Sequence, residues 1–134
     1  GEALIKAGRP AEAAQAFATA LRHDPRKSGI IQIGYGQALL ATGKPDQVRK
    51  AVNELKSGLS RAKDYAAGYR YLAQAYGHLG DVGEAELATA EGHYHSGNIR
   101  DARIFAARAQ QKLARGTPSW TRAQDIINTR QAGR

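Results

Sequence analysis

The chain has 134 residues, of which 42% are hydrophobic and 24% are charged, and this composition predicts one globular domain with an ordinary core. It contains no cysteine, which excludes disulfides and thiolate chemistry. No run of about 18 apolar residues occurs, so the sequence predicts no membrane-spanning helix.

The net charge of +8 is concentrated towards the C-terminal end. Residues 1–97 carry 12 Lys and Arg against 10 Asp and Glu, whereas residues 98–134 carry 8 against 2. A basic segment of this kind can attract nucleic acid, anionic lipid headgroups or acidic protein segments. The alternative is a solvated face that binds nothing.

The first predicted elements are two helices joined at a glycine. Residues 2–7 are expected to end a helix at Gly8, and Pro10 opens the next helix, where its missing N–H leaves no hydrogen bond unmade. Pro25 ends that second helix, because proline disfavours helical geometry in the residue before it. The apolar stripe of the second helix is Ala13, Ala14, Phe17, Ala20 and Leu21.

The next predicted helix runs from Ser28 or Gly29 to Thr42 and carries large apolar residues on more than one face. A following helix begins after Gly43, with Asp46 as its cap, and is expected to end near Lys56. Residues 57–63 are predicted to form a looser linker and a possible joint, because they include a glycine among charged and hydroxyl residues.

A helical hairpin is predicted over residues 64–97. Tyr69, Leu72, Ala73 and Tyr76 fall on one face of its first helix, because residues three and four apart are neighbours. Gly80 closes that helix, since glycine adopts a left-handed backbone without a steric penalty, and Asp81 caps the next helix. The second helix carries Ala85, Leu87, Ala88 and Tyr94 and ends at Gly97.

Glycines within predicted helices cost about 1 kcal/mol each relative to alanine, so they need a compensating reason. The hairpin contains four of them: Gly68, Gly77, Gly83 and Gly92. We expect close helix approach at these positions, with room for a ligand as the alternative.

A basic helix is predicted from Ile99 to Ala114, with Asn98 and Asp101 as a weak form of capping box. Its buried stripe is Ala102, Phe105, Ala106, Ala109 and Leu113. Its basic residues lie on the opposite side, interrupted by Ile104, and continue to the end of the helix: Arg100, Arg103, Arg108, Lys112 and Arg115.

A final helix is expected to follow Gly116, with Thr117 as its cap and Pro118 at its first position. Its apolar stripe is Trp120, Ala123, Ile126 and Ile127. Such a closing helix would cover the last exposed apolar face of a repeat array.

The turn glycines indicate a repeat. Gly8 and Gly43 are 35 residues apart and Gly43 and Gly80 are 37 apart, close to the tetratricopeptide (TPR) period of about 34 residues. Gly97 follows Gly80 after half a period, so one helix is expected to serve two neighbouring units. The sequence therefore predicts an all-α, TPR-like α-solenoid of about seven to eight helices with a C-terminal capping helix, filling residues 1–134.

The chain also begins part-way through a repeat and contains no methionine. If Gly8 is a turn glycine, roughly seven residues of the opening helix are missing. We therefore expect the chain to be a fragment of a longer protein.

No catalytic constellation emerges from the residue pattern. His93 and His95 are two apart on a helix, so they point in different directions and cannot bind one ion together. The H-E-x-x-H motif is absent, and the GYG sequence at residues 34–36 lacks the strand and lysine of a phosphate-binding loop. The sequence predicts no catalytic residue, no cofactor and no metal in this segment.

Instead the pattern favours binding of a peptide or protein partner. In a TPR array the first helix of each pair lines the concave surface, and by this register Ile30, Ile33 and Leu40 would point there or pack on a neighbouring helix. Arg70 would pair with a carboxylate of the partner. The predicted partner-binding set on this face is Gln37, Arg70, Gln74, His78 and Tyr94.

The C-terminal half carries a family resemblance. The glycine pair at Gly80 and Gly97, the basic helix of residues 99–114 and the closing sequence RGTPSWTRAQDII together resemble the C-terminal TPR domain of BepA-like bacterial zinc metallopeptidases. The likeness covers residues 64–128 well and the first half only generically.

The resemblance implies a periplasmic location and a role in the assembly and quality control of outer-membrane proteins. It also implies that zinc and the H-E-x-x-H motif lie upstream, and that this segment recruits substrate or assembly machinery and restricts access to the protease. The alternative is a free-standing basic helical-repeat module that binds nucleic acid or an anionic surface, and nucleic acid is the less favoured partner.

Overall fold

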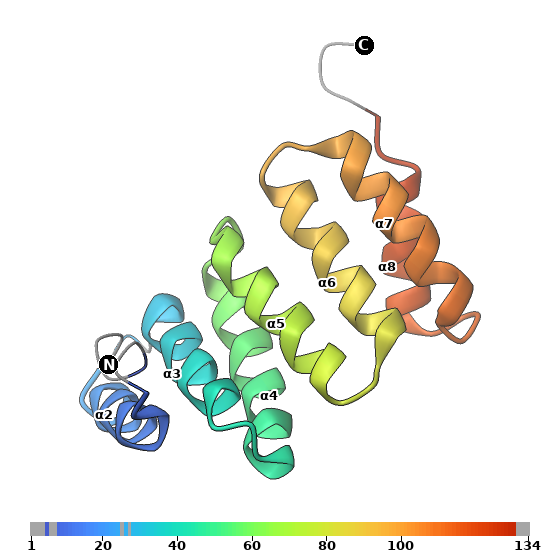
Figure 1. Ribbon diagram of the computed structural model, residues 1–134. Helices are drawn as coiled ribbons and strands as arrows, with labels where there is room; N and C mark the ends of the chain where they lie inside the picture. Colours follow the sequence, from blue (N-terminus) through green and yellow to red (C-terminus); the bar gives the residue numbers. More distant parts are fainter. Residues whose placement is uncertain (1–4, 6–7, 25, 27, 131–134) are drawn as a thin grey trace.

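The computed structural model describes residues 5, 8–24, 26 and 28–130, and within them the chain forms seven helices and no strand. Figure 1 shows these helices following one another across the molecule in chain order. This confirms the all-α, TPR-like helical repeat. The helices are α2 (Pro10–Arg22), α3 (Gly29–Ala41), α4 (Pro45–Arg61), α5 (Ala66–His78), α6 (Val82–His95), α7 (Ile99–Lys112) and α8 (Pro118–Ile127). No described helix is both long and apolar enough to cross a membrane.

The predicted turn glycines are confirmed. Gly43 and Gly80 have φ angles of +70° and +80°, a left-handed conformation that a side chain with a Cβ atom adopts only under strain. Two predicted caps are also confirmed: a side-chain oxygen of Asp81 accepts a hydrogen bond from the Glu84 N–H at 3.4 Å, and that of Thr117 from the Trp120 N–H at 3.3 Å.

Two other caps differ from the prediction. Pro45 occupies the first position of α4, so Lys44 is the N-cap and Asp46 lies within the first turn, where it pairs with Arg49. Asn98 precedes α7, but its side chain donates to the Asp101 carboxylate at 2.9 Å and caps no backbone N–H.

The predicted linker at residues 57–63 is wrong for residues 57–61, which continue α4 to Arg61. Gly58 and Leu59 are buried there. Gly58, which suggested a helix break, instead lies at the contact with α3, because its missing Cβ lets α4 pack directly against that helix.

The basic helix α7 is shorter at its C-terminal end than expected, because it stops at Lys112 and not at Ala114.

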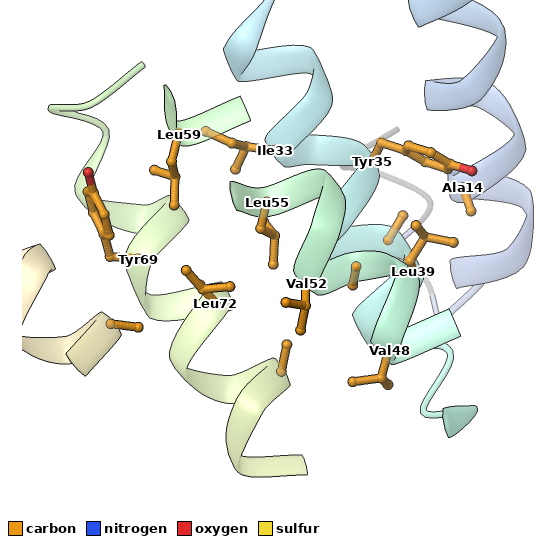
Figure 2. Close-up of a cluster of buried hydrophobic side chains, with 14 of the residues drawn as sticks. Ala14, Ile33, Tyr35, Leu39, Val48, Val52, Leu55, Leu59, Tyr69 and Leu72 are labelled. Atoms are coloured by element: carbon orange, nitrogen blue, oxygen red, sulfur yellow. The ribbon is translucent and has the colours of Figure 1, made fainter. Parts of the chain in front are cut away.

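The core consists of two clusters. The first fills the space between α2, α3, α4 and α5 and receives Ala88 from α6. Figure 2 shows buried side chains of this cluster, among them Ile33, Leu55 and Leu72, gathered between the helices. Ile33 is only 1% exposed, so of its two predicted roles it packs on neighbouring helices, as half-buried Leu40 also does. Ile30 is 57% exposed.

The second cluster joins α6, α7 and α8 and is rich in alanine: Leu87, Ala90, Ala102, Ala106, Ala109, Ala123 and Ile126. Small side chains let helices approach closely. Because α6 packs on α5 and also on α7 and α8, it is shared between two helix pairs, as the half-period spacing of the glycines predicts.

Three of the four glycines within the hairpin lie at close contacts, as predicted. A Cβ atom at Gly68 would lie 2.6 Å from a Leu59 methyl, one at Gly92 would lie 3.1 Å from the Tyr69 Cβ, and one at Gly83 would lie 3.1 Å from a Leu113 methyl. Gly77 is the exception, because a Cβ there would meet nothing within 4 Å.

Candidate functional site

A groove of about 520 Å³ lies between α4, α5, α6 and the start of α8. We call it the α4–α6 groove. Its apolar lining includes Leu59, Leu72, Tyr76, Leu87 and Ala88. Its polar lining includes Lys56, Ser60, Lys63, Glu84, Glu91, His95, Ser119 and Arg122.

The groove exists because α4 and α6 do not pack together. Within the described part of the chain, α4 packs against α3 and α5, whereas α6 packs against α5, α7 and α8. The two helices therefore stand as opposite walls, with α5 joining them.

Arg122 and Glu91 form an ion pair between α8 and the α6 wall. The Arg122 Nε lies 3.0 and 3.1 Å from the two carboxylate oxygens, and its Nη2 lies 2.7 Å from one of them. The hydrogen bond to Glu91 raises the pKa of Arg122. The guanidinium also lies 4.9 Å from the centre of the Tyr94 ring. Its charge is thus compensated within the chain.

His95 lies beside this pair and links α6 to α5. Its ring stacks on Tyr69 at 5.2 Å, and its two ring nitrogens lie 3.7 Å from carboxylate oxygens of Asp64 and Glu91. These distances exceed hydrogen-bond length. No group of three or more potential metal ligands occurs among the described residues.

Two tyrosines of α5 reach the groove as neutral groups. Burial raises the pKa of Tyr69 and that of Tyr76 to about 12, with nearby carboxylates as smaller causes. The Tyr69 hydroxyl donates to the Lys63 carbonyl at 2.8 Å. On the α6 wall, the Ser119 hydroxyl donates to the Glu84 carboxylate at 2.7 Å.

Two lysines line the groove on its α4 side, Lys56 on the helix and Lys63 two residues after its end. Among the residues that the structure describes, neither the Lys56 nor the Lys63 ammonium has an ion-pair partner. Both side chains line the groove and both residues are exposed. They are available to a bound partner.

The residues predicted to bind a partner lie elsewhere, and none of the five lines the groove. Arg70 and Gln74 are exposed one turn apart on α5, and Gln37 is half-buried on α3, which packs against α5. A ring nitrogen of His78 lies 3.2 Å from the Gly43 carbonyl. We call these four residues the α3/α5 face. Tyr94 packs instead in the second core cluster, beside His95 and Arg122.

The predicted basic set is partly engaged within the chain. Lys112 pairs with Glu86, the Arg108 guanidinium lies 5.1 Å from the Phe105 ring centre, and that of Arg115 lies 5.9 Å from the Trp120 ring centre. Arg100 and Arg103 are exposed near Ile104, which is 44% exposed. Three of the five basic residues thus have a contact partner within the chain.

Sequence reasoning missed the groove. Its tyrosines, Tyr69 and Tyr76, belong to the apolar stripe of α5, which we interpreted as core. The two walls of the groove come from helices that are far apart in the sequence. The available signal was the half-period spacing, because a helix shared between two pairs departs from the regular stack at that point.

The described helices define an all-α helical-repeat fold. The tetratricopeptide repeat family matches residues 4–57, which span α2, α3 and most of α4, and this supports a TPR domain. TPR repeats generally mediate protein–protein interactions, and a TPR domain is typically non-catalytic. No curated protein matches the chain.

Proposed function

We propose that this chain is a protein-interaction module that holds a segment of a partner polypeptide in the α4–α6 groove. The observation that carries the proposal is the groove itself, whose floor of nearly buried apolar side chains lies between two helices that do not pack together. Concave sites with an apolar lining and a few polar groups are where proteins bind ligands. Helical grooves of this kind accept peptide segments through apolar anchor residues.

The α3/α5 face is proposed as a second contact surface for the partner. Arg70 and Gln74 project from one side of α5 and make no ion pair within the described residues. Arginine recognises carboxylates with paired hydrogen bonds, and Gln74 supplies both a donor and an acceptor. A partner chain that crosses this face would be held mainly by its polar groups.

The finer proposal concerns the parent protein. We infer that the module is the non-catalytic, substrate-recruiting C-terminal domain of a periplasmic zinc metallopeptidase that acts in outer-membrane protein quality control. The sequence motifs within residues 64–128 are the support for this proposal. An H-E-x-x-H motif upstream in the same reading frame would support the parent, and a frame without one would exclude it.

Site-specific photo-crosslinking tests the module's function in the full-length protein. A crosslinking amino acid at Ser60 reports on the groove and one at Gln74 reports on the α3/α5 face, while one at Gln111 on α7 is the control. We expect discrete polypeptide adducts at Ser60 and Gln74 that are absent at Gln111. Equal labelling at all three positions would contradict the proposal.

A double variant tests the α3/α5 face separately. Arg70→Ala with Gln74→Ala changes two exposed side chains, so helical circular dichroism is expected to stay unchanged. We expect weaker capture of the crosslinked partner. Unchanged capture would exclude this face while leaving the groove in place.

A further inference from the structure

We propose that the α4–α6 groove selects a partner segment in which large apolar side chains alternate with carboxylates along one edge. This inference rests on the proposed function and adds the chemistry of the occupant. It follows from the apolar lining and from the charges that remain unpaired around it.

The lining requires apolar side chains from the occupant. Leu59, Leu72 and Leu87 reach the groove from three different helices, and each is nearly buried but leaves part of its surface open. An aliphatic or aromatic side chain that enters would remove this surface from water, which is favourable. A polar side chain would lose its hydration without finding a partner there.

The charges set the polar character of the occupant. Arg122 is neutralised by Glu91, whereas Lys56 on α4 and Lys63, two residues beyond its end, have no ion-pair partner within the described ranges. Glu84 stands on the opposite wall, where it accepts a hydrogen bond from Ser119. Carboxylates along the α4 edge would meet cations, and lysines there would meet like charges.

Three synthetic peptides test this inference with the full chain. The first alternates Leu and Phe with Glu, the second replaces Glu with Lys, and the third keeps Glu but replaces Leu and Phe with Ser. Binding is followed by fluorescence anisotropy and by amide chemical shifts of the isotope-labelled chain. We expect the first peptide to bind most tightly and to shift the amides of Leu59, Leu72 and Leu87.

Two pairs of variants locate the interaction. Lys56→Glu with Lys63→Glu is expected to weaken binding of the first peptide about tenfold, or about 1.4 kcal/mol, whereas Arg100→Glu with Arg103→Glu makes the same charge change on α7 and leaves binding unchanged. Ser60→Trp, at an exposed position on the rim, is expected to block entry, and Ser60→Ala is its control.

Several results would overturn the inference. They are equal affinity for the Glu and Lys peptides, no binding of any of the three, or chemical shifts confined to the α3/α5 face. Each of these would leave the proposed function standing if Ser60 still crosslinks to a partner in the full-length protein. Loss of the crosslinks at both Ser60 and Gln74 would remove the proposed function itself.

Discussion

Gly29 of α3 and Gly58 of α4 face each other across the closest contact between these two helices. A Cβ atom built on Gly29 would lie 2.6 Å from the Gly58 carbonyl oxygen, and one built on Gly58 would lie 2.8 Å from the Gly29 carbonyl oxygen. Both obstacles are backbone atoms, which cannot move aside as the end of a flexible side chain can. The missing side chains therefore fix how closely α3 and α4 pack.

Substituting Gly58→Ala is expected to destabilise the protein. Alanine favours the helix by about 1 kcal/mol, but the added methyl also meets Ile33 at 2.8 Å, and overpacking of a core costs typically about 1–3 kcal/mol. We expect a net loss of roughly 1 kcal/mol or more, since the obstacle is backbone. Urea unfolding measures it as a lower midpoint at unchanged slope.

Gly77→Ala is the matched control for this prediction. Gly77 lies within α5 and is exposed, and a Cβ there would meet nothing within 4 Å. Only the greater helix preference of alanine over glycine then remains, so the free energy of unfolding of this variant is expected to rise by about 0.5–1 kcal/mol. Stabilisation by Gly58→Ala as well would show that α3 and α4 are not in close contact.

The helix order was predictable because its signals are local. A glycine that closes a helix acts on its own backbone, so Gly43 and Gly80 mark turns in the sequence and have positive φ in the structure. A glycine that permits close packing depends instead on a helix elsewhere in the chain. Gly58 therefore looked like a helix breaker, although it lies inside α4.

Although the half-period spacing of the glycines marked the helix that departs from the regular stack, sequence reasoning missed the groove for a related reason. Its α6 wall is held to α8 by Glu91 with Arg122 and by Glu84 with Ser119, pairs that are 31 and 35 residues apart. The periodicity of a helix indicates only contacts between residues a few positions apart, so it does not predict contacts between residues this far apart in the sequence. The register of a regular array predicts which side chains line the concave face, and Arg70 and Gln74 are exposed on α5, but the register says nothing of a gap between α4 and α6.

A double-mutant cycle on Glu91 and Arg122 is expected to give a clear coupling energy. The side chains are 22% and 35% exposed, and hydrogen bonds between charged groups contribute about 1.5–3 kcal/mol when shielded. Allowing for partial exposure, we expect a coupling of roughly 1–2 kcal/mol in the free energy of unfolding. Glu91→Ala, Arg122→Ala and the double variant complete the cycle.

The ion pair between Arg9 and Glu12 provides the comparison for that cycle. Its side chains are 57% and 54% exposed, and exposed pairs contribute at most about 1 kcal/mol. The same cycle there is expected to give a smaller coupling. Equal values at the two sites would mean that the α6–α8 pair contributes no more than a surface contact.

Stability is expected to fall at alkaline pH because of Tyr69. Burial, with a smaller effect of Glu91, raises its pKa from 10.0 to about 12, so the folded chain holds this proton more tightly than the unfolded chain. The resulting stabilisation is complete below pH 10 and is lost as the pH rises to about 12. A shift of this size corresponds to at most roughly 2–3 kcal/mol.

Tyr69→Phe separates this titration from other alkaline effects. The variant loses the hydrogen bond to the Lys63 carbonyl, which costs about 1 kcal/mol at neutral pH, but it has no phenolic proton to lose. Its free energy of unfolding is therefore expected to fall less steeply between pH 10 and about 12 than that of the native chain.

Urea unfolding at a series of pH values measures how steeply the free energy of unfolding falls for the native chain and for Tyr69→Phe. Tyr65→Phe, at an exposed position, is the control. If the Tyr69→Phe and native slopes coincide, the folded and unfolded chains release this proton alike, and Tyr69 is not shielded from water as the structure describes.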